Sequence, residues 1–161
     1  MLQLKIWAIA SVLSQPPTSQ STQDGQLTLL DRELEKVALN QHKRVIPLEK
    51  AADQLGLFDN LSLNAQMELL DSALEGYQEL DKELEKLTQH YLKGETGWFF
   101  CNMEDDLKSA SPEIKDFVLN KLIIDRNQNM VTSIIDHIEE NEAFIAIGAL
   151  HLPGEKGVLN Y

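Results

Sequence analysis

Hydrophobic residues recur every three or four positions along much of this chain, the spacing that gives an α-helix one apolar face. The longest such pattern covers residues 62–93. Ser62 suits the N-cap of this segment, because its hydroxyl oxygen can accept a hydrogen bond from a free backbone N–H of the first turn. Gly76 is expected to bend or split the segment and Gly94 to end it. The pattern therefore predicts about thirty helical residues, interrupted once.

Two further stretches carry the same helical spacing. One covers residues 31–40, and the other covers residues 111–138. Ser111-Pro112 at the start of the second stretch is typical of a helix N-terminus, with serine as the N-cap and proline at the first helical position. We expect a break near residues 125–127, where the apolar spacing is interrupted.

The pattern changes near the C-terminus. Ala143–Ile147 is a continuous apolar run without a polar face, which predicts a strand covered on both sides. We expect this strand to lie next to residues 45–48 in a sheet. The apolar run Ile6–Leu13 has three interpretations: a short secretory signal peptide, a strand, or the start of a buried helix.

A turn that carries a histidine and an acidic residue follows the predicted C-terminal strand directly. In open α/β sheets, ligands bind where loops meet the carboxyl ends of the strands. Gly148 allows a close backbone approach there, and Glu155 falls just after a Pro-Gly turn. His151 is the candidate metal ligand or general acid/base. The alternative is that His151 is a hydrogen-bonded structural residue.

Composition narrows the class of protein. The 161 residues fit a single domain, and 14 basic against 26 acidic side chains give a net charge of −12. Such a surface repels phosphate backbones, so we expect no nucleic-acid partner. No stretch approaches the length of about 20 apolar residues that a membrane span requires.

Residues 95–110 lack a regular period and are expected to be irregular. They hold the only cysteine, Cys101, next to three aromatic residues. One cysteine excludes an intramolecular disulfide and a cysteine-built zinc site. Burial among the aromatic rings would raise the pKa of the thiol, so Cys101 is predicted to have a packing role in preference to that of a nucleophile.

Several of these segments together resemble the TraB/PrgY/GumN family, which includes the Tiki-type Wnt-cleaving proteases. Residues 144–159, FIAIGALHLPGEKGVL, resemble the terminal signature of the family. Further similarities, in the same order along the chain as in the family, lie in Lys5–Leu13, in Leu48-Glu49 with Gln54, in Tyr91–Glu95 and in Ile124–Met130. The similarity in Lys5–Leu13 implies that residues 1–13 are an internal segment and not a signal peptide.

The resemblance implies an α/β fold, with a mostly parallel sheet flanked by helices and a helical insertion over residues 62–93. Family members carry two Gly-x-x-His motifs, and only the second, Gly148–His151, is present. We therefore expect residues 1–161 to be the C-terminal part of a single, incomplete domain. Apolar surface left open by the missing strands would favour a homodimer. The family also suggests an extracytoplasmic location for the full-length protein.

The activity implied by the resemblance is metal-dependent hydrolysis of a peptide, with Mn²⁺ or Co²⁺ as the ion. His151 carries over as metal ligand or acid/base, and Arg126 as a charge clamp for a developing oxyanion. For Arg126, a structural salt bridge is the alternative. The predicted ligand-binding residues are Gly148, Glu49 and Glu155. The resemblance assigns no separate role to any of the three. The second hypothesis is a non-catalytic module that sequesters a peptide or small molecule.

Overall fold

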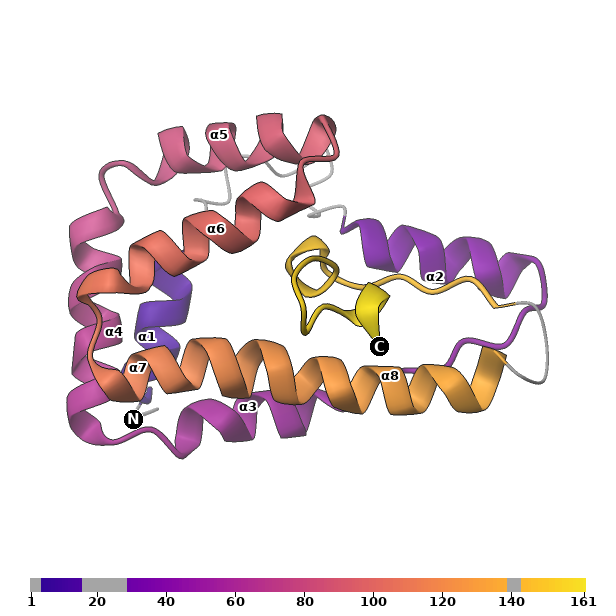
Figure 1. Cartoon of the computed structure of the whole chain (residues 1–161), viewed down its shortest axis with the longest axis horizontal. Coiled ribbons are helices and arrows are strands. Elements are labelled where there is room, and N and C mark those ends of the chain that lie inside the picture. Colours follow the sequence, from indigo (N-terminus) through magenta and orange to yellow (C-terminus); the bar gives the residue numbers. More distant parts are fainter. Residues whose placement is uncertain (1–3, 16–28, 139–142) are drawn as a thin grey trace.

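The computed structural model describes residues 4–15, 29–138 and 143–161. These residues form helices joined by turns and extended connections (Figure 1). The α-helices are α1 (Ile6–Leu13), α2 (Leu30–Asn40), α3 (Ala51–Asp59), α4 (Leu63–Gly76), α5 (Leu80–Leu92), α6 (Thr96–Asp106), α7 (Pro112–Asp116) and α8 (Asp125–Ile138). A π-helical segment, η3 (Phe117–Ile124), joins α7 to α8, and short 3₁₀ turns occur at η2 (Leu107–Ser109), η4 (Ala149–His151) and η5 (Val158–Asn160).

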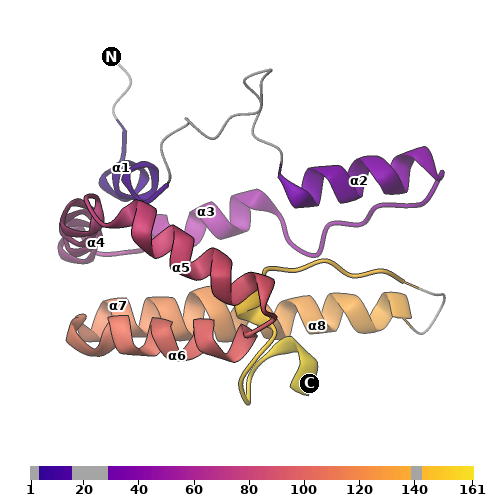
Figure 2. The same ribbon diagram turned by 90° about the horizontal axis from the view of Figure 1, so that it is seen from above.

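The longest element is the continuous rod made by α7, η3 and α8, which runs along one side of the molecule (Figure 2). Helix α3 packs against η3, while α1 packs against α4 at one end of the rod. The C-terminal turns lie between the rod and α6, since η4 contacts α6 and η5 contacts α8. The rod and α6 therefore position the Gly-x-x-His turn.

The N-termini of α4 and α7 are capped twice, once locally and once across the fold. Ser62 and Ser111 each accept a hydrogen bond from the backbone N–H three residues on, as the sequence predicts. The Glu113 carboxylate also accepts from the Ser62 N–H and hydroxyl, and the Glu68 carboxylate accepts from the Ser111 N–H. Each helix start is thus bonded to the other helix, which fixes the angle between α4 and the rod.

The hydrophobic core lies where α3, α4 and the start of the rod meet. Its buried members are Leu61, Ala65, Ile114 and Phe117. An aromatic row extends this core, because Phe58 stacks on Trp7 and meets the Phe117 ring edge-on. The core therefore lies at the opposite end of the rod from the free end of α8 (Figure 1).

The predicted α/β fold with a parallel sheet is wrong for the described residues, which contain no strand. Residues 143–148 are extended and run between α2 and α8 without backbone pairing to any described residue (Figure 2). Phe144 is 82% exposed, and Val45 in the expected partner segment is also exposed. An apolar run shows which residues favour burial, but a strand forms only where a second backbone supplies hydrogen bonds.

The helical predictions are confirmed for residues 31–40, 62–93 and 111–138, including the division at Gly76. Gly94 follows α5 with φ +72°, the left-handed conformation expected after a helix. The rod passes through residues 125–127 without the predicted break, since η3 continues into α8.

Two short segments differ from expectation. Residues 6–13 form helix α1, so of the interpretations considered the strand is wrong. Most of the stretch 95–110, predicted to be irregular, is helix α6. Its apolar residues Trp98, Phe99 and Phe100 are consecutive, so they hide the helical period. Cys101 on this helix is exposed, and the prediction that it is buried among the aromatic rings is wrong.

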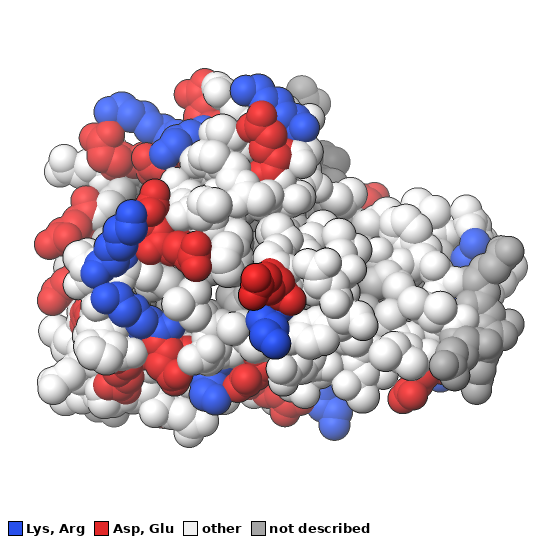
Figure 3. Space-filling model, in the orientation of Figure 1, with Lys and Arg blue, Asp and Glu red and all other residues white. Residues whose placement is uncertain are grey.

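Charged side chains are unevenly distributed over the face seen in Figure 3. Acidic and basic residues gather over α4 to α7, whereas the surface over α2 and the extended C-terminal segment is largely uncharged. Exposed apolar residues of these two elements include Leu30 and Val37 of α2 and Phe144 of the extended segment. Formation of a homodimer through such a surface stays a prediction. None of the helices in the described residues is long and apolar enough to cross a membrane.

Candidate functional site

The predicted site residue Arg126 and its neighbour Asn127 lie in the first turn of α8, immediately after the π-helical segment η3. A π-helix has i→i+5 hydrogen bonds and wider turns than an α-helix, and such turns are frequent at functional sites. Within the rod, Asn127 points toward the C-terminal turns, because its side chain bonds residues there. The start of α8 is therefore the base on which the Gly-x-x-His turn is held.

A buried hydrogen-bonded chain joins α8 to the C-terminal turns. Asn127 is completely buried, at 0% exposure, and His151 is 9% exposed. The Asn127 amide nitrogen donates to the Lys156 carbonyl oxygen at 2.6 Å. Its Oδ1 lies 2.7 Å from Nδ1 of His151. Since an amide oxygen only accepts hydrogen bonds, this contact assigns the proton of the neutral imidazole to Nδ1. The His151 Nε2 atom then carries the lone pair.

The surroundings of His151 favour the uncharged ring. Burial lowers the pKa of His151 below its ordinary value, and the positive charge of Arg126 lowers it further, while Glu49 acts in the opposite direction. Nε2 makes no hydrogen bond to any other described residue. A neutral imidazole with an available lone pair is the form that binds a metal ion or accepts a proton.

Glu49 and Arg126 form a two-bond ion pair beside this histidine. The Arg126 Nε donates to Oε1 of Glu49 at 2.9 Å, and a terminal guanidinium nitrogen donates to Oε2 at 2.8 Å. Hydrogen bonds from Arg126 hold the pKa of Glu49 below its usual range, with a smaller contribution from Gln54. The side chain of Arg126 is 20% exposed and that of Glu49 is 15% exposed, so the pair is partly shielded from water. It anchors α8 to the segment that leads into α3.

The remaining hydrogen-bonding capacity of Arg126 decides what else it can do. Its other terminal nitrogen donates to the Leu122 carbonyl oxygen at 3.2 Å. Three of the five guanidinium N–H groups are thus used within the fold, and two are left for a ligand. The salt bridge that we considered as the alternative is present, and the role as an oxyanion clamp stays a prediction.

The glycines of the C-terminal turns have different structural roles. Gly148 lies against the histidine, where an added Cβ would be 3.6 Å from Cδ2 of His151. Gly154 has φ +90°, a conformation that L side chains rarely adopt. At Gly157, an added Cβ would lie 2.6 Å from the Pro153 carbonyl carbon and would overlap two carbonyl oxygens. The backbone is therefore folded tightly upon itself between residues 152 and 157.

The structure brings Glu49, Arg126, Gly148 and His151 together but places Glu155 elsewhere. Glu155 is exposed and lines a separate pocket formed with α6 and η3. Asn127, the residue that orients His151, was not among the site residues predicted from sequence. It stands next to Arg126 in the segment that resembles the family, but nothing in the sequence pattern shows that its side chain is buried.

Comparison with known families identifies the chain. A model of the TraB/PrgY/gumN family matches residues 1–161. The chain belongs to this family. Searches of curated proteins and of solved structures gave no match. The family assignment predicted from the Gly-x-x-His turn and the segments before it is confirmed.

A pH dependence of stability follows from the two perturbed groups of the site. His151 has a lowered pKa in the folded chain, so the unfolded chain binds more protons below pH of about 6.5. The free energy of unfolding is expected to fall as pH decreases through this range. The pKa of Glu49 is also lowered in the folded chain, so the free energy of unfolding should fall a second time below a pH of about 4.5.

Urea unfolding at a series of pH values measures this dependence. His151→Gln removes the first titrating group and should reduce the slope between pH 7 and pH 5.5, leaving the loss at lower pH. An unchanged slope in the variant would mean that His151 titrates alike in the folded and unfolded chains.

Proposed function

We propose that this family member contributes a histidine-bearing half of a peptide hydrolase site, with His151 as its functional side chain. The observation that carries the proposal is the Asn127–His151 contact, which orients the ring and directs the lone pair of Nε2 away from the bonded side. Orientation of a ligating or basic imidazole through its other nitrogen is typical of metal and acid–base sites. Family membership over the whole chain supports this function.

The ion that the family resemblance implies is Mn²⁺ or Co²⁺. Such an ion, when bound, would lower the pKa of a coordinated water and so supply a nucleophile at neutral pH. The described residues offer His151 Nε2 as one donor, and they contain no group of three histidine, cysteine or carboxylate side chains placed to hold a metal. Because a catalytic site commonly has three protein ligands, these residues alone should hold the ion weakly.

The chain's own residues would then have three tasks. Asn127 keeps the imidazole in one tautomer and one orientation. Glu49 fixes the Arg126 guanidinium beside the histidine, and the two N–H groups that remain would donate to a developing negative charge in the substrate. Burial keeps His151 neutral, so that Nε2 accepts a proton or binds an ion without first losing one.

Titration with Mn²⁺ followed by NMR tests this role directly. Bound Mn²⁺ broadens nearby signals, so the ring signals of His151 should broaden at lower Mn²⁺ than those of His42, His90 and His137. Millimolar Mg²⁺, which prefers oxygen ligands, should displace Mn²⁺ from surface carboxylates and leave the His151 effect in place. If His151 broadens no earlier than the other three histidines, it is not a metal ligand in this chain.

Peptide cleavage is the corresponding activity measurement, made with Mn²⁺ or Co²⁺ after adding a segment that supplies the first Gly-x-x-His motif. His151→Gln is expected to abolish turnover. It is a sharper variant than His151→Ala, which leaves the buried Asn127 oxygen without a donor and should lower the thermal midpoint as well. Turnover that survives His151→Gln would contradict the proposed role.

The second candidate function is a non-catalytic module that binds a peptide or small molecule. One observation favours it: a pocket of about 290 Å³, lined mainly by apolar side chains, lies outside the His151 site. This volume is close to the lower limit of about 300 Å³ for small-molecule sites. Binding to that pocket needs no hydrolytic group.

A further inference from the structure

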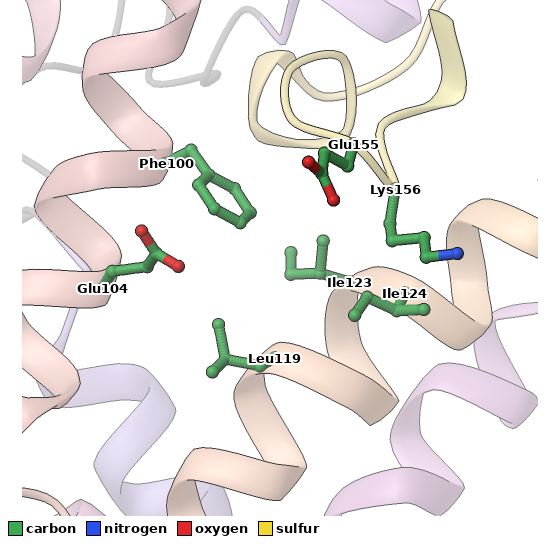
Figure 4. Close-up of a pocket in the computed structure, with 7 residues that line it drawn as sticks. All are labelled: Phe100, Glu104, Leu119, Ile123, Ile124, Glu155 and Lys156. Carbon is green, nitrogen blue, oxygen red and sulfur yellow. The ribbon is translucent and has the colours of Figure 1, made fainter. Parts of the chain in front are cut away.

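The pocket lies between α6, the π-helical segment η3 and the C-terminal turns (Figure 4). Phe100, Leu119, Ile123 and Ile124 form its apolar wall, and Glu104, Glu155 and Lys156 complete its lining. The residues of the candidate hydrolase site, His151 and Arg126 among them, do not line it. It is therefore a separate feature of the fold.

The π-helical geometry of η3 builds one wall of this pocket. Leu119, Ile123 and Ile124 are related by steps of four and five residues. In an α-helix, residues five apart point in different directions, since each residue turns the chain by about 100°. The i→i+5 repeat of a π-helix brings positions five apart onto one face. The wide turn thus places Ile124 beside Leu119 and Ile123, which gives a continuous aliphatic surface.

Two carboxylates face this aliphatic surface. Figure 4 shows Glu104, from α6, and Glu155, from the C-terminal turns, pointing toward the space between them, while the ammonium group of Lys156 points away. Neither Glu104 nor Glu155 makes an ion pair with another described residue. The pocket therefore combines an apolar wall with two carboxylates and with a lysine whose charged end is directed elsewhere.

We propose that this pocket binds an alkylammonium group, that is, an aliphatic chain that ends in a primary amine. The chain packs against Phe100 and the aliphatic face of η3, and the ammonium donates hydrogen bonds to Glu104 and Glu155. Both a free alkylamine and a lysine side chain of a peptide have this chemistry. The inference names the ligand class of the second candidate function and does not depend on the hydrolase proposal.

Titration of the chain with n-hexylamine, followed by NMR, is the test. 1-Hexanol is the control ligand, because it has the same chain and no charge. Hexylamine is expected to give saturable shifts at Phe100 and Ile123 and to bind several-fold more tightly than hexanol. Raising the salt concentration to about 0.5 M should reduce this difference, since salt screens partly exposed charges.

Variants separate the charge from the apolar wall. Glu104→Gln and Glu155→Gln should each weaken hexylamine binding by roughly two- to fivefold and leave hexanol binding unchanged. Glu75→Gln, the same substitution at an exposed position of α4 outside the pocket, should have no effect. Leu119→Ala should weaken binding of both ligands, because it removes part of the shared apolar contact.

A short peptide with one lysine, compared with the same peptide carrying acetyl-lysine, identifies the source of the group. Binding of both hexylamine and the lysine peptide, without binding of the acetyl-lysine peptide, points to a peptide ligand, and binding of hexylamine without the lysine peptide points to a free amine; both results support the assignment. Equal binding of hexylamine and hexanol would keep a ligand pocket but overturn the ammonium assignment. Absence of saturable hexylamine binding would overturn it as well, and neither result affects the role of His151.

Discussion

Replacing Gly157 with alanine is expected to lower the free energy of unfolding by about 3 kcal/mol, a cost typical of an atom forced into a closely packed region. The added Cβ would overlap the carbonyl oxygens of Leu152 and Pro153, which are backbone atoms and cannot rotate away. The turn would have to open, and opening it disturbs the Lys156 carbonyl that Asn127 holds. Urea unfolding of the variant and the parent chain measures the difference.

Gly56→Ala is the matched control. Gly56 lies within α3, and an added Cβ there would meet nothing within 4 Å. Since alanine favours a helix interior over glycine by roughly 0.5–1 kcal/mol, this variant should be as stable as the parent or slightly more stable. Equal stability of Gly157→Ala and Gly56→Ala would mean that the turn at residues 152–157 is looser than described.

Asn127→Leu is expected to cost about 3–4 kcal/mol, because it leaves two polar groups of the buried chain without a partner. The Lys156 carbonyl loses its donor, and the Nδ1–H of His151 loses its acceptor. Asn127 is completely buried and His151 is buried as well, so water does not reach the position of the amide without opening the fold. Thermal and urea unfolding both measure this loss.

Asn127→Asp tests whether residue 127 acts on His151 through a hydrogen bond or only fills space beside it. Aspartate has nearly the same shape and still accepts from Nδ1 of His151, but its second oxygen would face the Lys156 carbonyl oxygen. The new negative charge stabilises the imidazolium, so the pKa of His151 should rise relative to the parent chain, and stability should fall. An NMR titration of the His151 ring measures the pKa. A pKa that does not rise would contradict the contact between residues 127 and 151.

The helices were predictable from the sequence because their information is local. Ser62 and Ser111 mark helix starts through hydrogen bonds within four residues, and Gly94 marks an end through its backbone conformation. The strand predicted at Ala143–Ile147 does not form, since a strand depends on a partner distant in sequence. The apolar run fits a strand as well as it fits an extended connection.

The candidate site was predictable only as far as its residue types suggest chemistry. His151 stood out after a glycine-containing turn, and Arg126 through the family resemblance. The burial of Asn127, and the separation of Glu155 from Glu49, result from the way in which the C-terminal turns fold back on α8. Contacts of this kind do not repeat along the sequence, so the spacing of hydrophobic residues does not predict them.

The π-helical segment also fixes the angular phase between the two ends of the rod. Ile114 and Phe117 face the core with α3 and α4, while Asn127 faces the C-terminal turns. One residue added after η3 in regular α-helical geometry would rotate everything after it by about 100° relative to the core. Asn127 and Arg126 would then swing away from His151 and Glu49 with every helical hydrogen bond intact. The register of this one helix, counted in single residues, thus determines whether the site assembles.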